Sequence, residues 1–136
     1  ERRRHRTVEF MGEPAYRNYS LYDAASVADA RHCWSGDLGG LPRFSWFTLN
    51  LTDSVGHFAG PHSEMGRAAL RDTDARMGDI IAAIDRQGAL DRTAFVMCAD
   101  HGMQTIAESD AVDMSGPLRD AGVDHRMVDA QYVYLR

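Results

Sequence analysis

Two apolar segments of the chain, FSWFTLNL at residues 44–51 and TAFVMCA at residues 93–99, are its best candidates for strands. Each is almost continuously apolar, which is typical of a strand buried on both faces of a parallel sheet. The residues between them have a helical pattern, so the three together predict a strand–helix–strand unit with a right-handed connection. We therefore expect an α/β fold with a mostly parallel sheet flanked by helices.

The segment between the two candidate strands has signals for both ends of a helix. Ser63 can cap the N-terminus, and Glu64 follows in the first turn, where a negative charge favours the helix dipole. Gly88 provides a C-terminal stop. One face of this helix carries the apolar side chains of Leu70, Met77, Ile80, Ile81 and Ile84.

The flanking regions predict fewer elements. Residues 20–34 have the pattern of a second helix, whereas residues 1–18 are expected to be irregular because they contain Gly12 and Pro14. Residues 131–136 alternate like a strand. Because a strand needs partners, we expect residues 1–136 to be an incomplete domain from a longer polypeptide, with its core at about 42–104.

Composition excludes several classes of protein. The 136 residues carry 15 basic and 20 acidic side chains, a net charge of −5, which does not favour nucleic-acid binding. Cys33 and Cys98 form no Cys-x-x-Cys motif, so a Cys-based zinc finger is not expected. The sequence contains neither a secretory signal nor an apolar run of the ~20 residues that a membrane span needs, and it leaves the compartment unspecified.

Two clusters of metal-binding residue types follow the candidate strands. Asp53 and His57 come after the first strand, and Asp100 and His101 come after the second. The carboxyl ends of parallel strands share one edge of a sheet, so we expect these side chains to converge there. Carboxylate oxygen and imidazole nitrogen are ligands of catalytic zinc. Four such groups suit two metal ions roughly 3.5–4 Å apart.

Simpler explanations exist for each of these residues. Asp53 could be a loop or cap residue, and the Asp and Gly of the second cluster are common in turns. His125 is a further candidate ligand, but the favoured explanation is an exposed loop residue.

The two motifs, in their order and spacing, resemble the type I phosphodiesterase/nucleotide pyrophosphatase family of the alkaline phosphatase superfamily. The resemblance covers about residues 42–104, and the residues that carry it are Asp53-Ser-Val-Gly-His57-Phe-Ala-Gly60-Pro61 and Ala99-Asp100-His101-Gly102-Met103. It implies an alkaline-phosphatase-like fold with two divalent metals, usually zinc. Asp53 and His57 would bind one metal, together with a distant His. Asp100 and His101 would bind the other, together with an upstream Asp and an upstream Thr or Ser nucleophile.

The resemblance also implies the reaction. The nucleophile is phosphorylated, and a metal-activated water hydrolyses the intermediate. No residue before Asp53 matches the upstream Asp or the nucleophile, and His125 follows His101 by only 24 residues, where the family's third His comes far later. We therefore expect a segment that carries four metal ligands but is inactive alone.

The predicted function is hydrolysis of phosphodiester or pyrophosphate bonds in a small phosphoester, nucleotide or phosphonate. Alternatives within the superfamily are phosphonoacetate hydrolase-like, sulfatase-like and phosphomutase chemistry. An alternative of another class is a non-catalytic α/β module that binds a metal or a partner. A nucleotide-binding domain ranks lower because the chain has no Gly-x-Gly-x-x-Gly or P-loop motif. Exposed sheet edges would also allow self-association.

Overall fold

The computed structural model describes residues 2–128 and 132–135. The chain forms two compact units, residues 1–105 and residues 106–136. The first unit is helical, and its elements are α1 (Arg2–Cys33), α2 (Leu51–Ala59), α3 (Glu64–Arg86) and the short 3-10 helix η1 (Leu90–Arg92). The second contains the 3-10 helix η2 (Glu108–Asp110), α4 (Ser115–Asp120), β1 (His125–Val128) and β2 (Tyr132–Leu135).

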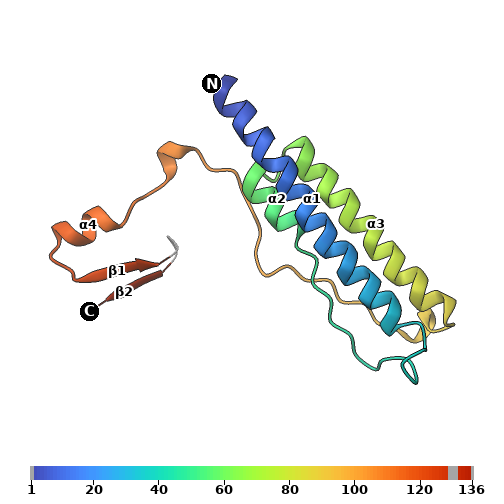
Figure 1. Cartoon of the computed structure of the whole chain (residues 1–136). Helices are drawn as coiled ribbons and strands as arrows, with labels where there is room; N and C mark the ends of the chain where they lie inside the picture. The colour runs from blue at the N-terminus through green and yellow to red at the C-terminus, as the bar shows by residue number, and fades with distance from the viewer. Residues whose placement is uncertain (1, 129–131, 136) are drawn as a thin grey trace. The chain divides into compact units, whose positions relative to one another are not determined.

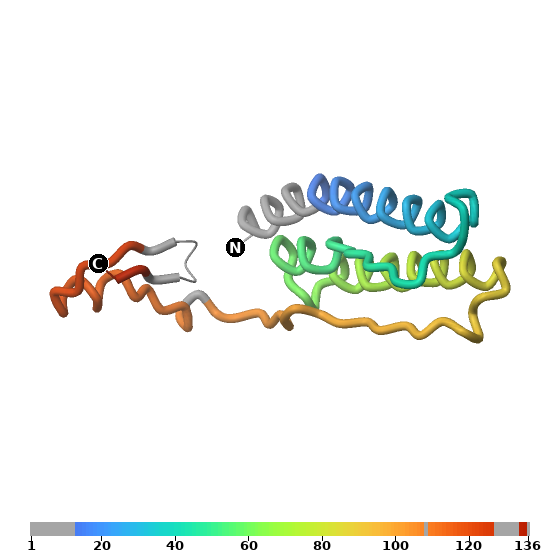
Figure 2. The backbone as a smooth tube through the Cα atoms, turned by 90° about the horizontal axis from the view of Figure 1, so that it is seen from below, coloured from blue at the N-terminus to red at the C-terminus, as the bar shows by residue number. Residues whose placement is uncertain are grey.

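The three helices of the first unit pack around two small apolar clusters. Helices α1 and α3 lie side by side and run in the same direction, and α2 lies beside their first halves (Figures 1 and 2). The cluster near the C-terminal ends of α1 and α3 contains Val27, Ala30, Trp34, Ile80, Ile84 and Ala89. The cluster around α2 contains Leu51, Val55 and Ala69, with Tyr16 and Tyr19 of α1 packed against it.

The predicted ends of the long central helix are confirmed, whereas Leu70 and Ile81 of its predicted apolar face are exposed. Helix α3 begins after Ser63, whose side-chain oxygen accepts a hydrogen bond from the backbone N–H of Gly66 at 2.9 Å. Beyond its end, Gly88 has a φ of 59°, a left-handed conformation that glycine adopts without strain.

Helix α1 is longer than the sequence predicted. Residues 1–18 were expected to be irregular, yet α1 begins at Arg2 and contains Pro14. A proline removes one helical hydrogen bond but does not always end a helix. Here Tyr16 and Tyr19 pack against the α2 cluster just after Pro14, and these contacts favour helix beyond the proline.

The predicted parallel sheet is wrong. Residues 44–50 and 93–99 form neither a helix nor a strand, and in the part of the chain that the structure describes they belong to no sheet. The sheet described there is the antiparallel pair of β1 and β2 in the second unit, where His125 pairs with Leu135 and Val128 with Tyr132. An apolar segment favours extended backbone, but it forms a sheet only when another strand satisfies its N–H and C=O groups. Without that partner, Trp46 is 70% exposed and Val96 is 89% exposed.

The second unit confirms one prediction and corrects another. Residues 132–135 of the predicted 131–136 strand form β2, and residues 131 and 136 lie outside the described residues. His125 lies in β1, where it is half-buried, and its Nδ1 contacts the carbonyl oxygen of Val123 at 2.8 Å, so it is not an exposed loop residue.

Among the helices that the structure describes, none combines the length and apolar character that crossing a membrane requires.

Candidate functional site

A buried carboxylate of α1 fixes the start of α2. Asp23 is fully buried, and its two oxygens accept hydrogen bonds from the backbone N–H groups of Asn50 (2.7 Å) and Leu51 (3.2 Å). The first N–H groups of a helix have no partner within the helix, and the Asn50 side chain does not cap them here. Asp23 therefore supplies the cap from a neighbouring helix.

Arg76 of α3 balances the charge of this buried carboxylate. Its Nη1 lies 3.7 Å from Oδ2 of Asp23, and its Nη2 donates a hydrogen bond to the Ser20 hydroxyl at 2.6 Å. A buried charge is tolerated when it is paired and hydrogen-bonded. The Asp23–Arg76 pair thus joins α1, α3 and the beginning of α2.

The first predicted motif lies within α2 and not in a loop. Asp53 is in the first turn and His57 in the last, so the two side chains are one turn apart on the same face of the helix. Nε2 of His57 lies 3.5 Å from Oδ1 of Asp53. The side chain of His57 is 64% exposed to solvent and that of Asp53 is 49% exposed.

The second predicted motif comes to the same place from the extended segment that follows α3. Nε2 of His101 lies 3.7 Å from Oδ1 of Asp53 and 3.7 Å from Oδ2 of Asp100. Met103 packs directly on Gly56, where a side chain would collide with its sulfur. Glycine at position 56 therefore allows this segment to approach α2.

Hydrogen bonds orient the His101 ring. Its Nδ1 lies 3.0 Å from the carbonyl oxygen of Gly102, and because a carbonyl only accepts, Nδ1 carries the proton in this contact. The backbone N–H of His101 donates to Oδ1 of Asp100 at 3.1 Å. Nε2 is the ring nitrogen that faces Asp53 and Asp100. Such a bond on one ring nitrogen is how metal-binding histidines are commonly oriented.

The structure thus connects the four predicted residues through three contacts centred on Asp53 and His101. Two ligands held about 2.0–2.1 Å from a tetrahedral zinc lie roughly 3.3 Å apart, and the observed donor separations are a few tenths of an ångström wider. The donor types fit a zinc ion. Within the described residues, however, no group of three or more His, Cys, Asp or Glu side chains is arranged to hold a metal ion.

A pocket of about 300 Å³ adjoins this cluster. His57 and Gly56 line it from α2, Pro61 from the following turn, and Met103 and Gln104 from the extended segment. It therefore opens beside one of the four predicted residues, His57.

The sequence analysis missed Asp23 and Arg76. Asp23, Val27 and Ala30 of α1 and Trp34 just after it are buried and follow one another at helical spacing. A carboxylate on this apolar stripe was the available signal for a capping role. Leu21, the first apolar residue of the predicted helix 20–34, is 69% exposed.

Comparison with known proteins identifies the family. The sequence profile of the type I phosphodiesterase/nucleotide pyrophosphatase family matches residues 7–136. The chain belongs to this family. The matched range includes both Asp/His motifs.

Two curated relatives match shorter parts of the chain. GPI ethanolamine phosphate transferase 2 of Aspergillus fumigatus is 43% identical over 51 residues, which cover 38% of this chain and 7% of the relative. Human ectonucleotide pyrophosphatase/phosphodiesterase family member 7 is 35% identical over 72 residues, which cover 46% of this chain and 16% of the relative. The chain therefore spans less than a fifth of either protein. No solved structure matches it significantly.

Proposed function

We propose that the chain is a segment of a metal-dependent hydrolase that cleaves phosphodiester or pyrophosphate bonds. In this proposal Asp53, His57, Asp100 and His101 are ligands of two divalent metal ions, with zinc as the preferred metal. Membership of the phosphodiesterase family supports the hydrolase class. The observation that carries the metal site is the position of Asp53 Oδ1, which lies 3.5 Å from Nε2 of His57 and 3.7 Å from Nε2 of His101.

Electrostatics supports a cation at this position. Carboxylate oxygens of Asp53 and Asp100 each lie 3.7 Å from Nε2 of His101. Two carboxylates this close together favour a positive charge between them, and a divalent cation would supply one. Carboxylate and neutral imidazole are also the ligand types that zinc accepts without cysteine.

The chain's own residues have separate tasks in this proposal. Asp53 and His57 present their donors from a rigid helix whose start is fixed by Asp23, and the bond to Gly102 orients His101. Bound divalent metals stabilise charge on phosphoryl oxygens and lower the pKa of a bound water. The 300 Å³ pocket beside His57 has room for part of a small phosphoester, nucleotide or phosphonate. The nucleophile is expected outside residues 1–136.

A second candidate is phosphoryl-group transfer to an acceptor other than water. The relative that supports it is named as an ethanolamine phosphate transferase and is 43% identical over 51 residues. Transfer and hydrolysis would use the same four ligands and would differ in the acceptor that the rest of the active site admits.

Thermal unfolding in the presence of zinc tests the proposal. A ligand that binds the folded chain stabilises it, by about 2.7 kcal/mol at a free concentration 100 times the Kd. We expect zinc to raise the unfolding temperature of the parent chain and of Asp91→Ala, a control at an exposed Asp outside the cluster. Asp53→Ala should lose this shift. Equal shifts in all three proteins would contradict the metal site.

A further inference from the structure

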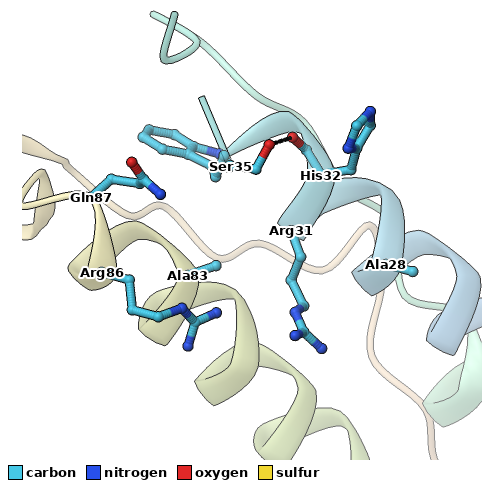
Figure 3. Close-up of a pocket in the computed structure, with 8 residues that line it drawn as sticks. Ala28, Arg31, His32, Ser35, Ala83, Arg86 and Gln87 are labelled. Atoms are coloured by element: carbon cyan, nitrogen blue, oxygen red, sulfur yellow. Dashed lines mark hydrogen bonds between the residues drawn. The ribbon is translucent and has the colours of Figure 1, made fainter. Parts of the chain in front are cut away.

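A second pocket lies at the other end of the helical unit, where α1 and α3 both end. Its volume is about 380 Å³, and its lining includes Arg31 and Trp34 from α1 and its C-terminal turn, and Arg86 and Gln87 from the end of α3. Figure 3 shows the side chains of Arg31 and Arg86 extending into the space between the two helices, whereas the imidazole of His32 points away from it. No Asp or Glu lines this pocket.

The two arginines have no carboxylate partner in the part of the chain that the structure describes. Other arginines of the same helices do: Arg17 pairs with Glu13, Arg67 with Glu64 and Arg76 with Asp23. Two guanidinium groups at one pocket without a counter-charge repel each other, and because both residues are exposed, solvent weakens this repulsion. An anion between them would remove that repulsion.

One residue that lines the pocket, Trp34, has a buried donor without a partner. The Nε1–H of Trp34 is buried and makes no hydrogen bond, although Trp34 lines the pocket. Buried donors without a partner are rare, and an unseen water or ion is a common explanation. Trp34 thus lines the pocket and carries a buried donor that the described part of the chain does not satisfy.

The dipoles of α1 and α3 offset only part of the positive charge of the two arginines. Arg31 and Arg86 lie in the last turns of their helices, where a cation favours the negative end of the dipole. Each helix end contributes roughly −0.5 of an elementary charge, so the two ends together offset about half of the charge on the two guanidinium groups. A net positive charge remains in the pocket.

We propose that this pocket binds a small oxyanion of the phosphate class, either free phosphate or the phosphate group of a monoester. A guanidinium group binds phosphate through two parallel N–H···O bonds, and two such groups can share one tetrahedral anion. The site lies at the opposite end of α3 from the Asp53–His101 cluster and does not depend on the proposed metal site. It would hold a phosphate-bearing ligand away from the proposed catalytic residues.

The fluorescence of Trp34 provides a readout at the site itself. The chain has two tryptophans, so the titrations use a Trp46→Phe background in which Trp34 is the remaining one. Inorganic phosphate is titrated at constant ionic strength, with sodium chloride as the non-specific salt and a nucleoside monophosphate as the second phosphate source. Arg31→Gln and Arg86→Gln are compared with Arg71→Gln, an exposed arginine of α3 that lies outside the pocket. Unfolding temperatures are measured for every variant.

The proposal predicts a saturable fluorescence change with phosphate that chloride does not cause. Because charge-assisted hydrogen bonds are lost, Arg31→Gln and Arg86→Gln should each weaken phosphate binding by about tenfold, and Arg71→Gln should not. A tighter response to the monophosphate than to free phosphate would identify the monoester as the better ligand. Two results would overturn the site: equal affinity in all variants, or the same response to chloride. Lower unfolding temperatures with unchanged phosphate affinity would assign the arginines to helix stabilisation alone.

Discussion

At the scale of single residues, two glycines of α3 have opposite surroundings. A Cβ atom at Gly66 would lie 2.8 Å from the carbonyl oxygen of Pro61 and 2.9 Å from that of Gly60. Both neighbours are backbone atoms and cannot turn aside as a side chain can. A Cβ atom at Gly78 would meet no atom within 4 Å. The turn between α2 and α3 therefore requires glycine at position 66. Position 78, in the middle of α3, has no such requirement.

We predict opposite effects of the same substitution at these two sites. Gly66→Ala should lower the free energy of unfolding by about 1–3 kcal/mol, because the backbone must shift to remove the overlap. Gly78→Ala should raise it by up to about 1 kcal/mol, because alanine favours a helix interior more than glycine does. Urea unfolding of both variants measures the difference. A change of the same sign at both sites would contradict the described packing of the turn.

At the scale of secondary-structure elements, the buried carboxylate of Asp23 should be essential for the position of α2. Asp23→Ala leaves the partly buried Arg76 without its counter-charge and two backbone N–H groups without an acceptor. We expect a loss of about 3–5 kcal/mol in the free energy of unfolding, the usual cost of breaking a buried ion pair on one side.

Asp29→Ala is the matched control for Asp23→Ala, because Asp29 is an exposed carboxylate of the same helix. It should change the free energy of unfolding by no more than about 0.5 kcal/mol. Equal losses in the two variants, measured by chemical denaturation, would show that Asp23 does not fix the start of α2.

A hydrogen bond between α1 and α3 should make stability depend on pH in the alkaline range. The Tyr16 hydroxyl donates to Asp72 at 2.6 Å. Burial, and after it this hydrogen bond, raises the pKa of Tyr16 from 10.0 to about 12. A raised pKa in the folded chain means that the stabilisation is complete below pH 10 and is lost as the pH rises from 10 to 12.

Tyr16→Phe tests this dependence. The variant should lose stability less steeply than the parent between pH 10 and 12, because phenylalanine has no proton to release. Tyr22→Phe, at an exposed position of the same helix, should follow the parent curve. Thermal unfolding across this pH range gives the curves, and parallel curves for the parent and Tyr16→Phe would contradict the prediction.

Local signals predicted both ends of α3. Prediction failed for the pairing of strands, which depends on residues far apart in the sequence. Ser63 and Gly88 determine the ends of α3 through contacts within a few residues, so sequence alone was sufficient. The apolar segments at 44–51 and 93–99 predicted extended backbone, but whether a strand has a neighbour depends on residues far away in the sequence. The first segment also ends in α2, because Asp23 binds the N–H group of Leu51 and starts a helix there.

The sequence predicted the residues of the candidate site but not Asp23, which fixes the start of the helix that carries two of them. Asp53, His57, Asp100 and His101 were named from two short motifs, and the structure connects them by contacts of 3.5–3.7 Å. Whether they bind metal stays a prediction. Asp23 was missed because a lone carboxylate in a helix has no motif, and its role appears only when α2 packs beside it.

At the scale of the whole molecule, exposed apolar side chains predict self-association. Trp46, Phe44, Val96 and Met97 are each at least 70% exposed, and all four lie on extended segments whose backbone groups are open to pairing. Sedimentation should show oligomers that grow with concentration, and the double variant Trp46→Ser, Val96→Ser should reduce them. Leu70→Ser, at an exposed position of α3, should not. Concentration-independent sedimentation of the parent chain would contradict this prediction.

The most direct test of the central claim is the zinc affinity of the chain, measured by calorimetry. We predict that the parent chain and His62→Ala, a control at an exposed histidine outside the cluster, bind zinc equally well. Asp53→Ala and His101→Ala should each bind it at least tenfold more weakly, because these two residues make the contacts that connect the four side chains. The same affinity in all four proteins would contradict a metal centre at this place.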